Sequence, residues 1–549
     1  MLLSVFFSSA KEGKMQTQHI HNRRLRLSAV MIVRNEQEVI SETIESVREI
    51  ADEIIVWDSG SEDATVSLAR ERGAKVIHGS WKNDFSAARN ECAEKATGDW
   101  LLWLDAGEKL SAATSAELRK FIDASADMRK VYRIMVEIPA ADSASAGEQN
   151  AQPRLLPAKA GLKFEGRVRE TLYPSIHAEG LKIDTGPGRI ICHLRKHSPA
   201  RKIQHAQRDL YLLALEFAEQ QKPNHRLLLA QGEAYSHLGI NDRAREAFIR
   251  AIELSEPGST DMLEGYYGLL TCYNSDPSLQ ETQIRVCLSA LGVFPFDAQL
   301  LLAMGNYLQM RGRLDLTARV FESALKIGRV DLSTWHLCEL PEVAASCLSM
   351  TLELQGKDQE ARCVLEEAMD QHPQSDRLQR VALDLSIKQG NARRAIELAK
   401  RSGAVSGETD PVIMAIRGAC KAAEHQWSAA IAYLQSAYKA GCRSPLCLRW
   451  LAVTLLSTGQ VEQAKPVLGQ WQQSEPNNPE LLAYLAAVQE KQEKSADLDT
   501  QTAEGPGERK SVKQQYRVDS GSESVQSSPI KIPLTHHGVS SNMPIHGEV

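Results

Sequence analysis

The stretch WLLWLDAGEKL, Trp100–Leu110, decides the fold of the first part of this chain. It opens with five consecutive apolar residues, which is the length and composition of a strand buried on both faces. The strand is expected to stop at Asp105, so that a carboxylate lies at its C-terminal end. Open α/β sheets bind their ligands in the crevice outside the carboxyl ends of the strands. The sequence therefore predicts an α/β domain with Asp105 at a ligand-binding edge.

Strand-like and helix-like segments alternate with regular spacing before Trp100. The expected strands are Leu27–Val33, Glu53–Asp58 and Ala74–Gly79, and the expected helices are one that begins at Asn35 with Glu38 as its capping partner, TVSLARERG and SAARNECAEKATG. This alternation predicts parallel strands joined by right-handed crossovers. Since parallel strands end at one edge, Glu36 and Asp58 are expected to converge with Asp105 on one crevice.

The loop after the first strand reads VRNEQE and holds no glycine. The glycine-rich dinucleotide fingerprint needs glycines there, because they let a pyrophosphate approach the backbone. Acids around a crevice instead suit ribose hydroxyls, a nucleobase N–H, or a divalent cation that carries a diphosphate. The first domain is therefore expected to bind a nucleotide through side chains.

Four motifs resemble, in order and spacing, the nucleotide-sugar half of family 2 glycosyltransferases: MIVRNE, IIVWDSGSEDAT, DFSAARN and GDWLLWLDAGE. The resemblance covers about residues 25–200. Within the family, this segment is similar to bacterial lipopolysaccharide-core glucosyltransferases, which act on cell-envelope polysaccharide. It implies a GT-A-type, Rossmann-like domain. It also implies transfer of a hexose from an NDP-sugar, expected to be UDP-linked, to a hydroxyl acceptor with inversion.

The resemblance assigns roles to four of these residues. Glu36 and Asp58 would contact the uracil or ribose of the donor, and Arg89 would lie near the diphosphate, where a guanidinium fork suits phosphate oxygens. Asp105 would be the first acid of the family's Asp-x-Asp motif, which implies a divalent cation, Mn²⁺ or Mg²⁺. The second acid of that motif is replaced here by Gly107, and the adjacent Glu108 is expected to point elsewhere unless the loop rearranges.

A later stretch, QPRLLPAKAGLKFEGRVRETL, resembles the family's PRLF…FEGRVHE. Glu170 stands where the family has its general base, which takes a proton from the attacking hydroxyl. Arg169 replaces the histidine before it. In RIICHL, His193 matches a family histidine near the metal or diphosphate. Because neutral imidazole is a competent ligand for such ions, His193 would partly compensate for Gly107.

Each of these residues also has a purely structural interpretation. Asp58 could order the SGSED turn that follows it, Arg89 could lie on the surface of its helix, and Asp105 could cap a turn. Glu170 could pair with a neighbouring arginine, and His193 could be a core residue of its strand.

From about Ser198 nearly everything to about residue 493 has a helical pattern. Gly356 and Gly390 are 34 positions apart, and the segments around them align: LELQGKDQEARCVLEEAM with LSIKQGNARRAIELAKRS. Glycine at the turn, alanine at helix contacts and proline after the second helix resemble tetratricopeptide repeats. About six or seven such repeats would stack as an α-solenoid with a concave face.

Length and composition set the remaining expectations. The chain of 549 residues is divided into a mobile N-terminus (1–24), the α/β domain (25–200), a helical linker with the repeat solenoid (201–494) and a disordered tail (495–549), and 139–152 is expected to be a loop. The net charge of −6 gives no electrostatic footprint for nucleic acid, and no apolar window is long enough for a transmembrane helix. Ten cysteines without CxxC spacing suit reduced thiols in a cytosol.

Two hypotheses follow from these patterns. In the first, the chain is a cytoplasmic glycosyltransferase whose repeats bind a protein partner or an acceptor polypeptide, or hold the enzyme near an inner-membrane assembly. In the second, the change to Gly107 has abolished turnover, and the chain is a scaffold whose repeats carry the function. Detectable transfer or hydrolysis of any NDP-sugar by the pure protein separates the two.

Overall fold

The computed structural model describes residues 24–140, 146–193, 199–220, 224–274, 277–407, 409–476, 478 and 480–489. Internal contacts group the described residues into two compact units. The first, an α/β unit, contains those up to Val136 and those from 151 to 193. The second, a helical unit, contains those of 137–150 and those from 199 onward. The N-terminal segment up to residue 23 and the tail from residue 495, predicted to be mobile and disordered, lie outside the described residues.

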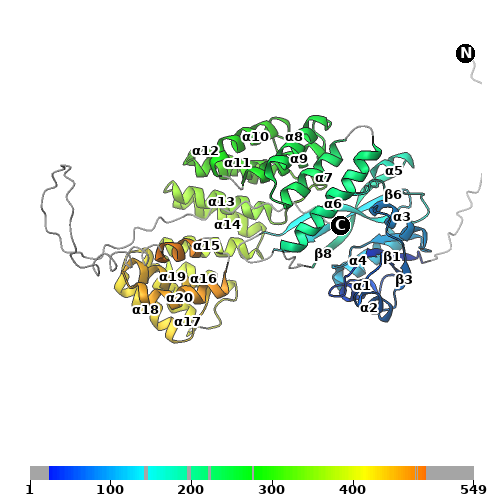
Figure 1. Ribbon diagram of the computed structural model, residues 1–549. Coiled ribbons are helices and arrows are strands. Elements are labelled where there is room, and N and C mark those ends of the chain that lie inside the picture. Colours follow the sequence, from blue (N-terminus) through cyan, green and yellow to red (C-terminus); the bar gives the residue numbers. More distant parts are fainter. Residues whose placement is uncertain are drawn as a thin grey trace, which may run out of the picture. The chain divides into compact units, whose positions relative to one another are not determined.

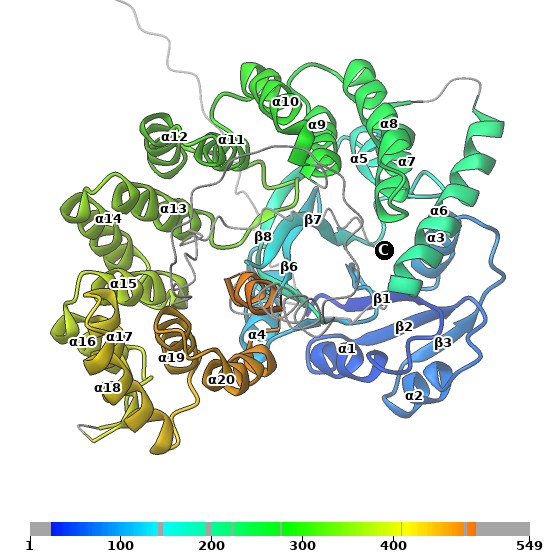
Figure 2. The ribbon, with the colours of Figure 1, turned by 60° about the vertical axis from the view of Figure 1, so that its left-hand side comes forward.

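The α/β unit begins with four parallel strands connected by helices (Figure 1). The elements are β1 (Leu27–Val33), α1 (Ile40–Val47), β2 (Glu53–Asp58), α2 (Thr65–Glu71), β3 (Lys75–His78), α3 (Phe85–Glu94) and β4 (Trp100–Trp103). Strand β1 pairs in parallel with both β2 and β4, and β2 with β3, which confirms the predicted alternation. Helices α1 and α2 lie on one side of these strands and α3 on the other (Figure 2). The connections through α1 and α2 run in one direction along the sheet and the connection through α3 runs in the other, so right-handed crossovers place α3 on the opposite face.

The sheet continues with strands that run in both directions. The elements are β5 (Glu108–Leu110), α4 (Ala112–Ala124), β6 (Lys130–Ile138), β7 (Glu148–Pro157), α5 (Tyr173–Ala178) and β8 (Lys182–Cys192). The order is β3-β2-β1-β4-β7-β6-β8-β5, and both β4–β7 and β5–β8 are antiparallel. The loop expected over 139–152 is therefore wrong from Glu148 onward. The polar residues from Glu148 onward form the first half of β7. The apolar second half of this strand pairs with β4 through Leu155 and Leu156.

The start of α1 differs from the prediction. The helix begins at Ile40 rather than after Asn35, and no side chain caps it. Asn35 has a left-handed backbone with φ of 56°, and it bridges to the loop after β2: its Oδ1 accepts the N–H of Glu62 at 2.9 Å. Its own N–H donates to Ser61 Oγ at 2.9 Å. Asn35, which the sequence predicted to cap a helix, thus joins the loop after β1 to the loop after β2.

The helical unit consists mainly of antiparallel helix pairs, as predicted for an α-solenoid. After α6 (Pro199–Glu219), its helices are α7 (His225–His237), α8 (Asn241–Leu254), α9 (Thr260–Asn274), η1 (Pro277–Leu279), α10 (Gln280–Val293), α11 (Ala298–Met310), α12 (Leu314–Ile327), α13 (Leu340–Leu354), α14 (Asp358–Gln371), α15 (Asp376–Lys388), α16 (Ala392–Arg401), α17 (Pro411–Ala423), α18 (Trp427–Lys439), α19 (Pro445–Ser457) and α20 (Val461–Ser474). A short strand, β9 (His336–Leu337), pairs with the first residues of β7.

The turn inside most helix pairs is made by a glycine with a left-handed backbone. These glycines are Gly239, Gly312, Gly356, Gly390 and Gly459. Residues with a Cβ rarely adopt this conformation. The backbone of the turn therefore explains why the sequence pattern has glycine at these positions. Between α17 and α18 the position is held instead by His425, with φ of 58°.

Small residues allow the paired helices to approach closely. A Cβ on Gly305 of α11 would come within 2.2 Å of the Phe321 ring of α12, and one on Gly418 of α17 within 2.7 Å of Leu434 of α18. Phe321 and Leu434 are both fully buried. Within the described residues, no helix is long and apolar enough to cross a membrane.

Candidate active site

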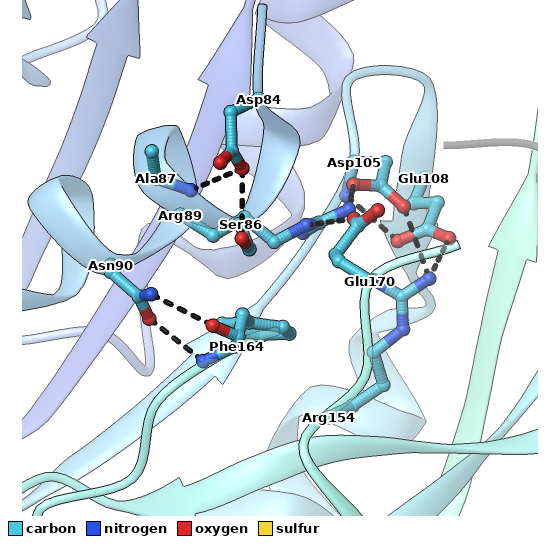
Figure 3. A network of polar contacts seen from close by, with 10 residues as sticks. All are labelled: Asp84, Ser86, Ala87, Arg89, Asn90, Asp105, Glu108, Arg154, Phe164 and Glu170. Atoms are coloured by element: carbon cyan, nitrogen blue, oxygen red, sulfur yellow. Dashed lines mark hydrogen bonds and ion pairs between the residues drawn. The ribbon is translucent and has the colours of Figure 1, made fainter. Parts of the chain in front are cut away.

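Asp105 lies directly after β4, where the sequence predicted it. Its Oδ1 is 3.1 Å from Nη2 of Arg89, and its Oδ2 is 3.2 Å from Nη2 of Arg154 (Figure 3). Its side chain is 20% exposed, which makes it the most accessible of these three charged groups. Burial raises the pKa of Asp105, but the charges of the two guanidinium groups outweigh it and hold the pKa below its usual value.

Arg89 comes from α3, whose first turn is capped by Asp84 through a 2.9 Å bond from the Ala87 N–H. The Arg89 side chain is 5% exposed, and its Nε donates to Oε1 of Glu170 at 2.5 Å. Its guanidinium also lies 5.1 Å from the centre of the Trp103 ring. Burial lowers the pKa of Arg89, but Asp105 and Glu170 together raise it above the ordinary value. Arg89 is therefore a buried cation with two carboxylate partners.

Glu170 is presented by a loop that is tied to α3. Glu165 and Thr171 exchange backbone hydrogen bonds of 2.9 Å, and the Phe85 N–H donates to the Arg167 carbonyl at 3.1 Å. Glu170 itself is 2% exposed in its side chain. While Arg89 binds its Oε1, its Oε2 is buried without a hydrogen-bond partner. One oxygen of this carboxylate is thus fixed by Arg89, and the other has no hydrogen-bond partner.

Two residues join this network that the sequence did not assign to it. Glu108 was expected to point elsewhere, but its Oε2 accepts the Asp105 N–H at 2.8 Å and its Oε1 lies 2.7 Å from Arg154. Burial raises the pKa of Glu108 to about 7, although Arg154 acts in the opposite direction. Arg154 lies in the PRLL segment of β7 and is 6% exposed, with its Nε unpartnered. The sequence signal for its role was its place in the PRLL segment, which resembles the family's PRLF, but no function was assigned to it there.

The backbone explains why Gly107 can stand where the Asp-x-Asp motif has its second acid. Gly107 has φ of 94°, a left-handed conformation that a residue with a side chain rarely adopts. Its N–H donates to Thr43 Oγ1 at 2.9 Å, and its carbonyl accepts the His193 N–H at 2.7 Å. The side chain of His193 is exposed at this point. His193 thus reaches the Asp105 loop through its backbone.

Asp58 is the last residue of β2, and Glu36 lies in the loop after the neighbouring strand β1. Asp58 is 1% exposed, and its carboxylate accepts the N–H groups of Gly60 at 3.1 Å and Ser61 at 3.2 Å. Glu36 is half-buried, and its N–H donates to Thr65 Oγ1 at 2.7 Å. The structure therefore brings Arg89, Asp105 and Glu170 into one network. It places Glu36 and Asp58, the two nucleoside candidates, at the carboxyl ends of β1 and β2, each with hydrogen bonds of its own.

The side chains around Asp105 do not fit the divalent cation that the sequence resemblance implies. Both Asp105 oxygens already accept hydrogen bonds from guanidinium groups, and a cation there would lie beside two positive charges. Over the described ranges, no three His, Cys, Asp or Glu side chains are grouped so that they could hold a metal ion. Hard cations such as Mg²⁺ need several oxygen ligands at once.

Comparison with known proteins finds one family match in each unit. Residues 28–128 match the family model described as Glycosyl transferase family 2, and residues 421–488 match one described as Tetratricopeptide repeat. The chain therefore combines a family 2 glycosyltransferase domain with tetratricopeptide repeats. The family match includes Arg89, Asp105 and Glu108, and it ends before Arg154 and Glu170.

Individual relatives cover parts of the chain. A TPR repeat-containing protein from Synechococcus elongatus is 48% identical over 97 residues, which is 18% of this chain and 24% of that protein. An uncharacterized glycosyltransferase from Rickettsia felis is 36% identical over 114 residues, 21% of this chain and 40% of that protein. The chain thus spans less than half of either relative.

Among solved structures, glucosyl-3-phosphoglycerate synthase from Mycobacterium tuberculosis, in complex with Mn²⁺, UDP and glucosyl-3-phosphoglycerate, is 21% identical. The match covers 21% of this chain and 43% of that chain, with a TM-score of 0.18.

Proposed function

We propose that this protein transfers a hexose from an NDP-sugar, UDP-linked by preference, to a hydroxyl acceptor with inversion. The observation that supports this most directly is the free carboxylate oxygen of Glu170 within a buried network around Asp105. A general base needs an oxygen that is held in place and can accept the proton of the acceptor hydroxyl. Oε2 of Glu170 meets these requirements, because Arg89 holds the other oxygen.

In the proposed reaction, Glu170 takes the proton of the acceptor hydroxyl as its oxygen attacks the anomeric carbon of the donor. The bond from that carbon to the diphosphate oxygen breaks on the opposite face, and the nucleoside diphosphate leaves. Glu36 and Asp58 would orient the nucleoside, since Glu36 follows β1 and Asp58 ends β2. Asp105 would contact the ribose, because its carboxylate is the partly exposed member of the network.

The test is release of nucleoside diphosphate from a panel of NDP-sugars by the full chain, measured with and without candidate acceptors. Glu170→Gln is expected to lower the rate about 10²- to 10⁴-fold, as loss of a general base does. Glu165→Gln, in the same loop but exposed, is the matched control and is expected to keep the rate. A fully active Glu170→Gln variant with unchanged circular dichroism would refute the assignment.

A second candidate function is supported by Gly107 and by the two arginines on Asp105. These features suit a domain that keeps its fold without turning over a donor, on a chain whose repeats mediate protein–protein interaction. The same assay separates the candidates. Any NDP-sugar turnover that Asp105→Asn abolishes supports the enzyme, and no turnover of any donor supports the scaffold.

We further propose that the protein works in the cytoplasm, where its repeats bind a protein partner or an acceptor polypeptide, or hold the enzyme at the inner membrane. All ten cysteines are free thiols, which suits a reducing compartment. Stacked tetratricopeptide-type helix pairs form extended binding surfaces.

A further inference from the structure

The charge beside Asp105 is provided by two arginines from separate segments of the chain. Arg89 on α3 binds Oδ1 at 3.1 Å, and Arg154 on β7 binds Oδ2 at 3.2 Å. The two contacts use both oxygens of the carboxylate. A divalent cation on Asp105 would have to displace at least one guanidinium group, and each arginine is held by a further carboxylate, Glu170 or Glu108.

Gly107 and Glu108, which follow Asp105 closely along the chain, offer no replacement ligand. Glu108 uses one oxygen on Arg154 at 2.7 Å and the other on the Asp105 N–H at 2.8 Å. Gly107 brings no side chain, its left-handed backbone disfavours one, and its carbonyl already accepts the His193 N–H. Arg154 is the residue that holds this arrangement, because its Nη2 lies between Asp105 and Glu108.

We propose that the nucleotide-sugar site of this chain works without a divalent cation, because Arg89 and Arg154 occupy both oxygens of Asp105. Arg154 is a positioning residue in this arrangement. It orients Asp105 and Glu108 rather than reacting itself, and its unpartnered Nε is a further buried donor on the same guanidinium. The inference rests on the proposed function, since it concerns how the same site holds a nucleoside diphosphate.

The first test is calorimetric titration of the full chain with UDP, GDP and ADP, once in EDTA and once in Mn²⁺. At least one nucleotide is expected to bind with a Kd that agrees within about threefold between the two conditions. Binding only in Mn²⁺, or at least tenfold tighter in it, would overturn the inference and leave the proposed function standing. If none of the three binds in either condition, the proposed function fails and the inference fails with it.

Variants then test the role of Arg154. Arg154→Met is expected to weaken metal-free binding of that nucleotide at least tenfold, and Arg154→Lys to restore part of it, since lysine keeps the charge without the fork. Arg129→Met is the matched control, because Arg129 is exposed and pairs only locally with Asp127. Wild-type affinity in Arg154→Met would refute the positioning role. If that variant does not fold, the comparison of Arg154→Lys with wild type decides, because an unchanged Kd in Arg154→Lys would refute the positioning role of the guanidinium group.

Discussion

The two units of this protein bury different kinds of side chain. The α/β unit places five charged groups together in one interior site: Arg89, Asp105, Glu108, Arg154 and Glu170. The helical unit is packed through apolar clusters in which alanine and leucine side chains of successive helices meet. Arg449 is a cation of this unit with two carboxylate partners, Asp384 and Glu480, and it joins α19 to α15 and to the segment after α20.

This difference predicts how each unit responds to substitution. A buried charge depends on its partners, because an unpaired ion in the interior is far more costly than a lost apolar contact. Apolar repeat packing distributes its energy over neighbours, so damage there is expected to stay local. The four predictions below test this contrast, from the largest expected effect to the smallest.

Removing Arg89 is expected to have the largest effect. Arg89→Met leaves Glu170 and Asp105 without their shared cation, and breaking such a buried pair costs about 3–5 kcal/mol. Thermal denaturation of the full chain measures the loss. The double variant Arg89→Met with Glu170→Gln is expected to recover part of it, since the amide needs no counter-charge. A double variant that is no more stable than the single one would contradict the ion-pair explanation.

Truncating the buried ring of Phe321 is expected to cost about 3 kcal/mol, because it leaves a cavity between α11 and α12. Hydrogen exchange should become faster in these helices and in α13, while α17–α20 stay protected. Phe296→Ala is the control, as that ring is 46% exposed and should be nearly neutral. Faster exchange throughout the helical unit would show that the repeats are more cooperative than their packing suggests.

Glu148 gives the helical unit a dependence on pH. Burial raises the pKa of Glu148 to about 8, so the folded protein keeps a proton there that the unfolded chain releases from about pH 4.5 upward. Stability should therefore fall as the pH rises from about 5 to 8, by at most about 1.4 kcal/mol per pH unit. Glu148→Gln removes this slope. Its midpoint of thermal denaturation should match wild type at pH 5 and exceed it at pH 8; parallel curves would contradict the assignment.

The smallest effect is expected at the turn between α17 and α18. His425 holds the left-handed position that glycine holds in most other repeats, so His425→Gly should relieve backbone strain and stabilise the protein by about 0.5–1 kcal/mol. Gly459→Ala makes the reverse change one repeat later, and should destabilise by a similar amount. Midpoints of denaturant unfolding measure both. If His425→Gly is destabilising, the contact of the histidine ring with Trp427, 5.3 Å between centroids, outweighs the strain.

Much of the fold could be predicted from local patterns. The apolar run Trp100–Leu104 identified a buried strand with Asp105 at its end, and turn glycines such as Gly356 and Gly390 identified the repeats. Both are properties of short segments. A run of apolar residues indicates a buried strand, and a turn with a left-handed backbone favours glycine. Sequence alone therefore determined an α/β domain followed by helical repeats.

Only the tertiary structure decided how the charges at the site are paired. Glu170 meets Arg89 across 81 positions of sequence, and Arg154 meets Asp105 across 49, so no local spacing could show that these groups neutralise one another. Asn35 likewise caps no helix of its own, because a loop 27 residues away offers it better partners. A carboxylate at a strand end is fixed by local sequence, whereas what it binds depends on which distant segments the folded sheet brings beside it.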